Sequence, residues 1–308
     1  MLEELRIGIV GGGLMGHGIA QVLAGRGATV TVHDPVPEAL ASVPERIAAN
    51  LRALGEDPAL ARRVALAGTL EEAVNDADWV FEAAPERMEL KQDLFARLDA
   101  LAPDGCVLAT NTSVMRVTEI AARTQRPERV VGTHWWNPPF LIPLVEVVQG
   151  ERTDAGVVAR TMELLETAGK TPVHVKRDVP GFIGNRLQSA LWRQAFELID
   201  AGVCDAEAID TVVKASFGRR LAVLGPIENA DLIGLDLTLD VHEYVLPTLD
   251  PPSQPAAGLR ARVQAGDLGM KTGAGYRRWT AEEADAVRRR LLAHLSGATP
   301  TLRGGGGT

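Results

Sequence analysis

The chain has 308 residues, of which 46% are hydrophobic and 23% charged, which is typical of a globular protein long enough for two domains. The net charge of -8 without a basic run argues against a nucleic-acid partner. No segment approaches the roughly 20 apolar residues of a membrane span, and MLEELRIGIV lacks the features of a signal peptide. We therefore expect a cytoplasmic protein without a membrane partner. Cys106 and Cys204 have no metal-ligand spacing, so no metal is expected.

The first predicted strand, at 7–10, leads into the glycine-rich turn GGGLMG and then a helix at 14–26. Gly11 permits the tight turn, Gly13 lets the backbone approach a pyrophosphate, and Gly16 lets helix and strand pack closely. Free N–H groups at the start of the helix would bind the phosphates. A glycine turn that only serves packing is the alternative, but it leaves the next acidic residue unexplained.

That residue is Asp34, which ends the second predicted strand 18 residues after Gly16. A carboxylate at this place accepts hydrogen bonds from the ribose hydroxyls of the adenosine and repels a 2′-phosphate. No Arg or Lys follows it in DPVPEAL, so NAD is favoured over NADP. The spacing and its structural context together predict a dinucleotide site.

Strands and helices then alternate, which predicts a parallel sheet with helices on both faces. Helices are predicted at 37–54, 88–101, 117–123 and 154–168, and strands near 64–67, 76–83, 106–112, 129–135, 144–150 and 171–176. The Pro-rich turn NPPFLIP separates the strand that ends at Trp135 from the next strand. The last two strands should extend the sheet, and their direction stays open.

Pro180 and Gly181 break the chain, and the sequence beyond them is helical. Helices are predicted at 182–201, 206–217 and 281–295, and a helical run around 227–249. The predicted fold is therefore α/β, with an N-terminal Rossmann-like doubly wound sheet and a second, all-α C-terminal domain. The predicted domains are 1–180 for NAD binding, 181–300 for the helical domain, and 301–308 for a disordered tail.

Ligands of doubly wound sheets lie beyond the carboxyl ends of the strands, so polar residues that follow strands are the candidates. Glu86 follows the fourth strand, Asn111 and Ser113 follow the fifth, and His134 ends the sixth. His134 is the best candidate for a base, because alcohol oxidation releases a hydroxyl proton that needs an acceptor titrating near neutrality. For Asn111 and Ser113, an ordinary polar turn is the open alternative.

Glu146 lies twelve residues after His134, within the apolar run LVEVV. An isolated buried carboxylate is costly, so a partner is expected, and we predict that His134 is that partner. The carboxylate would hold the imidazole in one tautomer and stabilise its protonated form. The alternatives are that Glu146 caps a loop or meets an arginine in the core.

Six ordered motifs, GGGLMGHGIA, FEAAPERMELK, LATNTS, GTHWWNPP, PLVEVV and VPGFIGNR, resemble the L-3-hydroxyacyl-CoA dehydrogenase family. The likeness runs from about Arg6 to Trp279, since GVCDAEAID, GPIENADLIGLD and GMKTGAGY resemble its helical C-terminal domain. It implies NAD-dependent oxidation of a 3-hydroxyl group to a ketone in a small-molecule substrate, and a homodimer formed through the C-terminal domain.

The resemblance also implies roles for single residues. His134 would be the base and Glu146 its partner, while Ser113 and Asn185 would hold the substrate oxygens near the nicotinamide. The cofactor contacts, predicted or implied, are Gly11, Gly13, Leu14, Met15, Gly16, Asp34, Ala83, Glu86, Lys91 and Asn111, with Glu86 and Lys91 at the nicotinamide half.

This chain departs from the family pattern in places that concern the substrate. The common HFFNP is HWWNPP here, and segment 37–64 lacks the lysines with which CoA-using members meet the nucleotide part of CoA. Possible substitutes are Arg46, Arg52, Arg62 and Arg63, but Glu45, Glu56 and Asp57 lie among them.

GRRLAVLGPIENADLIGLDLT and the NPP turn look closer to a branch resembling lambda-crystallin and gulonate 3-dehydrogenase, whose substrates are free hydroxy acids. Arg219 and Arg220 are then candidate carboxylate ligands.

The hypothesis is NAD-dependent oxidation of a short 3-hydroxyacyl-CoA, such as 3-hydroxybutyryl-CoA, as in fatty acid metabolism. The nearest alternative is dehydrogenation of a CoA-free 3-hydroxy acid, either gulonate-like or carnitine-like. A catalytically silent, crystallin-like NAD-binding protein is the alternative from another class. A catalytic lysine, used by a related group of oxidoreductases, is disfavoured because GFIGNR contains none.

Overall fold

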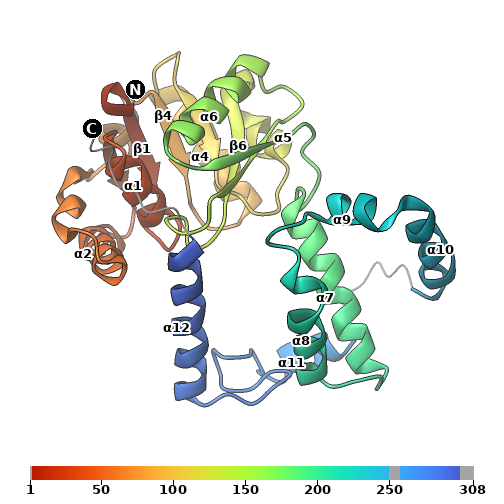
Figure 1. Cartoon of the computed structure of the whole chain (residues 1–308). Coiled ribbons are helices and arrows are strands. Elements are labelled where there is room, and N and C mark those ends of the chain that lie inside the picture. The colour runs from red at the N-terminus through yellow and green to blue at the C-terminus, as the bar shows by residue number, and fades with distance from the viewer. Residues whose placement is uncertain (1, 250–256, 299–308) are drawn as a thin grey trace, which may run out of the picture. The chain divides into compact units, whose positions relative to one another are not determined.

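The computed structural model describes residues 2–249 and 257–298, and its N-terminal part is built on one eight-stranded sheet (Figure 1). The strands are β1 (Arg6–Val10), β2 (Thr29–His33), β3 (Val64–Leu66), β4 (Trp79–Glu82), β5 (Val107–Thr110), β6 (Val130–Trp135), β7 (Leu144–Val148) and β8 (Thr171–Val175). Their order is β3-β2-β1-β4-β5-β6-β7-β8, and all neighbours are parallel except β6 and β7. The predicted doubly wound sheet is thus confirmed, and the proline turn reverses the chain before β7.

Helices pack on both faces of this sheet. They are α1 (Gly16–Gly25), α2 (Pro37–Leu54), α3 (Leu70–Val74), α4 (Met88–Leu101), α5 (Val117–Ile120) and α6 (Ala155–Thr167). One apolar core is formed with α1, α2 and α6, and the other with α3, α4 and α5. Because both faces are covered, all residues of β4, β5 and β6 are buried, and most are apolar.

The strand order places the candidate residues at one edge of the sheet. The strand β1 lies between β2 and β4, so successive crossovers run in opposite directions away from it. The carboxyl ends of β1, β4, β5 and β6 therefore lie side by side, and the segments after them face the same crevice. This topology brings the glycine turn, Glu86, Asn111 and His134 to a common edge.

The rest of the chain is helical, as expected. Its helices are α7 (Gly184–Asp200), α8 (Ala206–Ala215), α9 (Pro226–Ile233), α10 (Leu235–Val245), α11 (Ala257–Gln264) and α12 (Ala281–Ala298). The helical run predicted around 227–249 consists of more than one helix, because Gly234 takes a φ of 100° and separates α9 from α10. The prediction missed the short helix α3, although its Thr69–Glu72 capping box is readable in the sequence.

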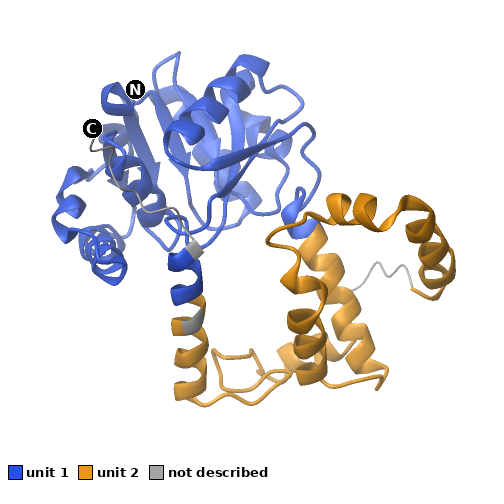
Figure 2. Ribbon diagram, viewed as in Figure 1, with its two compact units in different colours: residues 1–186, 292–308 blue, residues 187–291 orange. Residues whose placement is uncertain are grey.

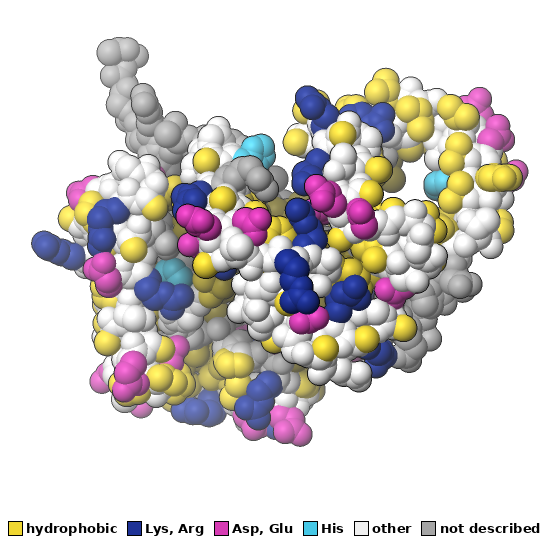
Figure 3. All heavy atoms as spheres, turned by 90° about the horizontal axis from the view of Figure 1, so that it is seen from below, with side chains coloured by type: hydrophobic (Ala, Val, Ile, Leu, Met, Phe, Trp, Pro, Cys, Tyr) yellow, Lys and Arg dark blue, Asp and Glu magenta, His cyan; other side chains and the backbone are white. Residues whose placement is uncertain are grey.

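The chain forms two compact units (Figure 2). Unit 1 holds the chain up to Arg186 and the end of α12 from Leu292, and unit 2 holds Leu187–Leu291. The predicted tail at 301–308 lies outside the described residues. Among the described residues of unit 2, only Ala274 and Ala284 are buried, and large apolar side chains are exposed along its helices (Figure 3).

Candidate active site

The turn after β1 has the geometry that a dinucleotide needs. Gly11 has a φ of 104°, and a Cβ there would lie 2.6 Å from the carbonyl oxygen of Ala83. A Cβ at Gly16 would overlap the carbonyl oxygen of Gly11. At Gly13, by contrast, a Cβ would meet nothing within 4 Å, which leaves open space for phosphates at the start of α1. Leu14 and Met15, two further predicted contacts, lie in this same turn, and Leu14 is exposed.

Asp34 braces this turn from the end of β2. Its Oδ2 accepts a hydrogen bond of 2.8 Å from the N–H of Gly12, and its Oδ1 accepts one from Val36. Two side chains that the sequence reasoning missed hold the turn from other sides. The Nδ1 atom of His17 lies 2.6 Å from the carbonyl oxygen of Gly13, and Arg46 donates to that of Gly12. Burial lowers the pKa of His17, so the ring is neutral at pH 7.

A buried ion pair lies where β4 and β5 end. The Nζ atom of Lys91 is 2.6 Å from Oε1 of Glu82, and the Thr110 hydroxyl donates to Oε2 of Glu82. Both charged side chains are almost fully buried. Sequence reasoning overlooked Glu82, although an acid in the apolar run WVFE, nine residues before a lysine, was a usable signal.

Glu86 connects this ion pair to the loop after β5. Its Oε1 accepts hydrogen bonds from the Thr112 hydroxyl and from the N–H of Ser113, and its Oε2 lies 3.4 Å from Nζ of Lys91. The ammonium of Lys91 is therefore held between two carboxylates. Contact of Glu86 and Lys91 with a nicotinamide stays a prediction.

The structure brings His134 and Glu146 together. They are cross-strand neighbours in the antiparallel pairing of β6 with β7. The Nδ1 atom of His134 lies 2.7 Å from Oε2 of Glu146, and both side chains are buried. Because a carboxylate only accepts, Nδ1–H is the donor, which leaves Nε2 as the ring nitrogen for a reacting proton. This is the arrangement of a general acid–base pair.

The other oxygen of Glu146 is held by the start of α7. Its Oε1 accepts hydrogen bonds of 2.9 Å from the N–H of Ile183 and 3.1 Å from that of Gly184. Burial alone would raise the pKa of Glu146, but the hydrogen bonds from His134, Gly184 and Ile183 outweigh it and lower the pKa. The carboxylate is therefore charged at neutral pH.

Four further side chains contact His134 or connect the segments next to it. The amide of Asn185 donates a 2.9 Å hydrogen bond to the carbonyl oxygen of Ser113, which ties the loop after β5 to α7. Two rings flank His134, with centroid distances of 5.0 Å to Trp136 and 5.8 Å to Phe182. Asn111 accepts a hydrogen bond from the N–H of Trp135 and so links the ends of β5 and β6.

Three further expectations concern a carboxylate site, a metal site and a membrane span. Arg219 and Arg220 are exposed residues of unit 2. Within residues 2–249 and 257–298, no group of three or more acids, histidines or cysteines is placed to hold a metal ion. Across the same ranges, no helix combines the length and the apolar character that a bilayer crossing requires.

Comparison with known proteins adds to this geometry. Residues 6–179 match the family model of the NAD-binding domain of 3-hydroxyacyl-CoA dehydrogenase, and residues 181–279 match the model of its C-terminal domain. The two models together span most of the chain, and the first covers the glycine turn and the His134–Glu146 pair.

Three curated relatives differ in the substrates that their names give. A 5-formyl-3-hydroxy-2-methylpyridine 4-carboxylate 5-dehydrogenase of Mesorhizobium japonicum is 36% identical, over 97% of this chain and 98% of its own. An L-carnitine dehydrogenase of Streptomyces coelicolor is 43% identical, over 74% of this chain and 73% of its own. A probable 3-hydroxybutyryl-CoA dehydrogenase of Bacillus subtilis is 39% identical, over 89% of this chain and 97% of its own.

A solved structure is similar to most of the chain. It is a 5-formyl-3-hydroxy-2-methylpyridine 4-carboxylic acid 5-dehydrogenase, described as an NAD+-dependent dismutase. It matches with a TM-score of 0.88 and 34% identity, over 95% of this chain and 97% of the other.

Proposed function

Because this chain belongs to the 3-hydroxyacyl-CoA dehydrogenase family, whose members are NAD-dependent dehydrogenases acting on CH–OH groups, we propose that it oxidises the hydroxyl group of a 3-hydroxy acid or of its thioester. The observation that carries the proposal is the buried pair of His134 and Glu146 at the edge of the sheet where the glycine turn also lies. NAD is the cofactor of the family, and the open space before Gly13 and the brace from Asp34 fit a dinucleotide.

In the proposed reaction, Nε2 of His134 takes the hydroxyl proton while the carbon loses a hydride. NAD, when bound, supplies the acceptor for that hydride. Glu146 stabilises the imidazolium that forms, because its carboxylate is charged and lies against Nδ1. The hydroxyl of Ser113 and the amide of Asn185 orient the substrate oxygens, and correct orientation alone contributes several kcal/mol to catalysis.

The first candidate substrate is a short 3-hydroxyacyl-CoA. It is supported by the family and by the Bacillus subtilis relative, which is named as a probable 3-hydroxybutyryl-CoA dehydrogenase. In such a substrate, the thioester carbonyl would be a second oxygen for the side chains of Ser113 and Asn185 to bind.

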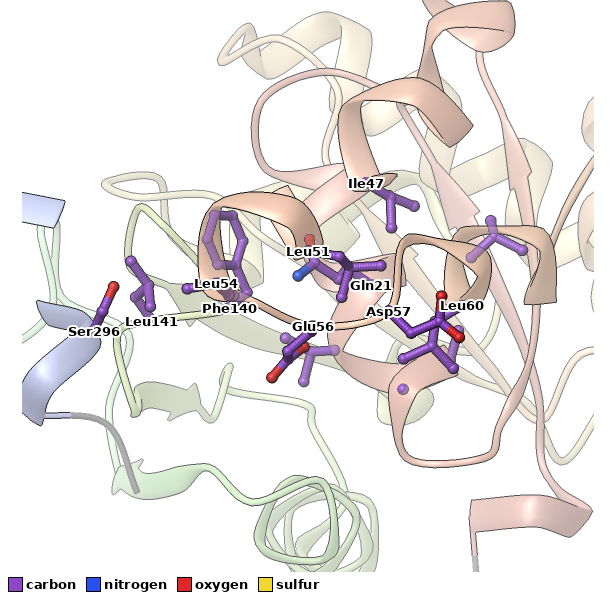
Figure 4. Close-up of a pocket in the computed structure, with 14 residues that line it drawn as sticks. Gln21, Ile47, Leu51, Leu54, Glu56, Asp57, Leu60, Phe140, Leu141 and Ser296 are labelled. Atoms are coloured by element: carbon purple, nitrogen blue, oxygen red, sulfur yellow. The ribbon is translucent and has the colours of Figure 1, made fainter. Parts of the chain in front are cut away.

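A cavity on the segment from 37 to 64 favours the second candidate, a CoA-free hydroxy acid. This cavity of about 330 Å³ is lined by α1, α2, the turn that follows α2, and Phe140 and Leu141 of the proline turn (Figure 4). Its polar lining includes the acids Glu56 and Asp57, which would repel the phosphates of CoA.

Two of the four arginines of this segment are engaged by other groups, whereas Arg62 and Arg63 are exposed. Arg46 donates to the carbonyl oxygen of Gly12, and Arg52 pairs with Glu45 at 2.6 Å. The L-carnitine dehydrogenase relatives are named for a CoA-free substrate, which agrees with this choice. We therefore rank the CoA-free 3-hydroxy acid ahead of the thioester.

A substrate panel tests the ranking. NADH formation would be followed with 3-hydroxybutyryl-CoA, free 3-hydroxybutyrate, carnitine and gulonate, with the His134→Ala variant as the blank. We expect at least one free acid to exceed the thioester by about tenfold or more in kcat/KM. The reverse order would support the CoA thioester. Bound NADH without turnover of any hydroxy acid would support a silent NAD-binding protein.

We also propose that unit 2 joins two copies of the chain into a homodimer. The helices α9 and α10 bury none of their residues, and Ile227 and Leu232 are 74% and 70% exposed. A surface this apolar is costly in a monomer. Sedimentation velocity of the parent protein should give the mass of two chains. The Leu232→Asp variant should give the mass of one chain. The control variant Leu66→Asp, on the edge strand β3 of unit 1, should stay dimeric. A monomeric parent protein would contradict this.

A further inference from the structure

The chain between β8 and α7 contains a strained turn next to His134. Gly181 and Phe182 follow each other with φ values of 76° and 50°. Phe182 is the only residue other than glycine with a positive φ in the described part of the chain. Bulky side chains are disfavoured in this left-handed conformation, so the surrounding structure must hold it in place.

Packing of the Phe182 ring supplies that hold. The side chain is 1% exposed and belongs to the apolar core formed with α3, α4 and α5. Its ring centroid is 5.8 Å from that of His134. The backbone is anchored as well. The N–H of Phe182 donates a hydrogen bond to the carbonyl oxygen of Val179, and the N–H of Gly181 donates one to the carbonyl oxygen of Val114.

The turn has a direct effect on the acid–base pair. The two N–H groups that follow it, on Ile183 and Gly184, converge on Oε1 of Glu146 at 2.9 and 3.1 Å. Successive N–H groups that converge after a left-handed residue form a concavity that binds anions. Here the bound anion is the carboxylate that faces His134.

We propose that Phe182 is a positioning residue of the His134–Glu146 pair, acting through the left-handed turn that aims the two N–H groups at Glu146. This inference rests on the proposed function. With Oε1 held by the backbone, the carboxylate cannot rotate, and Oε2 stays on Nδ1 of His134. The two donors also draw charge from the carboxylate, and this limits how strongly the pair binds a proton.

Two variants separate the turn from the ring. Phe182→Val and Phe182→Gly both remove the ring, but valine is β-branched and resists a positive φ, whereas glycine adopts it freely. The pH profile of kcat/KM for hydroxy-acid oxidation is the measurement, with thermal unfolding as a check that both variants fold. Because Nδ1 of His134 lies against Oε2 of Glu146, the two groups titrate together, and the acidic limb of the profile reports on this pair.

In Phe182→Val, the N–H donors move away from Oε1, and the pair takes up its proton more readily. The acidic limb should move to higher pH by about half a unit or more, with at least about a tenfold fall in kcat. In Phe182→Gly, the acidic limb of the kcat/KM profile should stay within about 0.2 pH units of its position in the parent protein. An unmoved limb in Phe182→Val, or equal shifts in both variants, would overturn the inference. A failed proposed function is recognised separately, because the parent protein itself would then turn over none of the hydroxy acids.

Discussion

Replacing His134 with glutamine should lower kcat/KM for hydroxy-acid oxidation by about a hundredfold to ten-thousandfold. Glutamine has roughly the size of the imidazole and can still hydrogen-bond to Glu146, but it cannot take a proton near neutral pH. The loss should therefore appear in turnover and not in folding. Steady-state kinetics with the best substrate of the panel is the measurement.

NADH binding and a second histidine provide the controls. The affinity for NADH, measured by fluorescence titration, should change less than about threefold, because the acid–base pair lies apart from the glycine turn along the sheet edge. His174→Gln should keep nearly full turnover, since that ring lies on β8 and contacts Gln149. Turnover of His134→Gln close to that of the parent protein would rule out its role as the base.

Replacing Gly16 with alanine should both destabilise unit 1 and abolish cofactor binding. A methyl group at this position would overlap the carbonyl oxygen of Gly11, which is backbone and cannot move without opening the turn between β1 and α1. Strain and overpacking of this kind typically cost about 1–3 kcal/mol or more. Thermal unfolding and NADH titration of the same preparation measure the two effects.

Two other glycines make this test specific. Gly25→Ala, at the other end of α1, has nothing within 4 Å of the new methyl group, so stability should be equal or slightly higher. Gly13→Ala also meets nothing within 4 Å, and it should fold normally while losing affinity for NADH, because the methyl group would occupy the approach of the phosphates. Normal NADH binding by Gly16→Ala would contradict the assignment of the turn.

Some of this molecule can be derived from short stretches of sequence, because the physics involved is local. Gly11, Gly13 and Gly16 between an apolar strand and a helix, with Asp34 beyond, are enough to predict a dinucleotide turn. The alternation of strands and helices is enough for the doubly wound sheet. The contact of Glu146 with His134 was predictable too, because an acid in a buried strand needs a partner and few were near in sequence.

Contacts between segments that are far apart in the sequence could not be predicted from these local patterns. Nothing within LVEVV indicates that the N–H groups of Ile183 and Gly184, 37 and 38 residues further along, hold the second oxygen of Glu146. The positive φ of Phe182 is likewise invisible, because local propensity disfavours it and only the packing of its ring in the core makes it stable.

The division is a physical one. Hydrophobic periodicity, turn chemistry and the cost of an unpaired buried charge act within a few residues, so the amino-acid sequence alone was sufficient to predict the sheet, the glycine turn and the contact between His134 and Glu146. The charge state and orientation of Glu146 depend on backbone donors that only the folded chain brings to it, so the tertiary structure decided how the carboxylate that faces His134 is held.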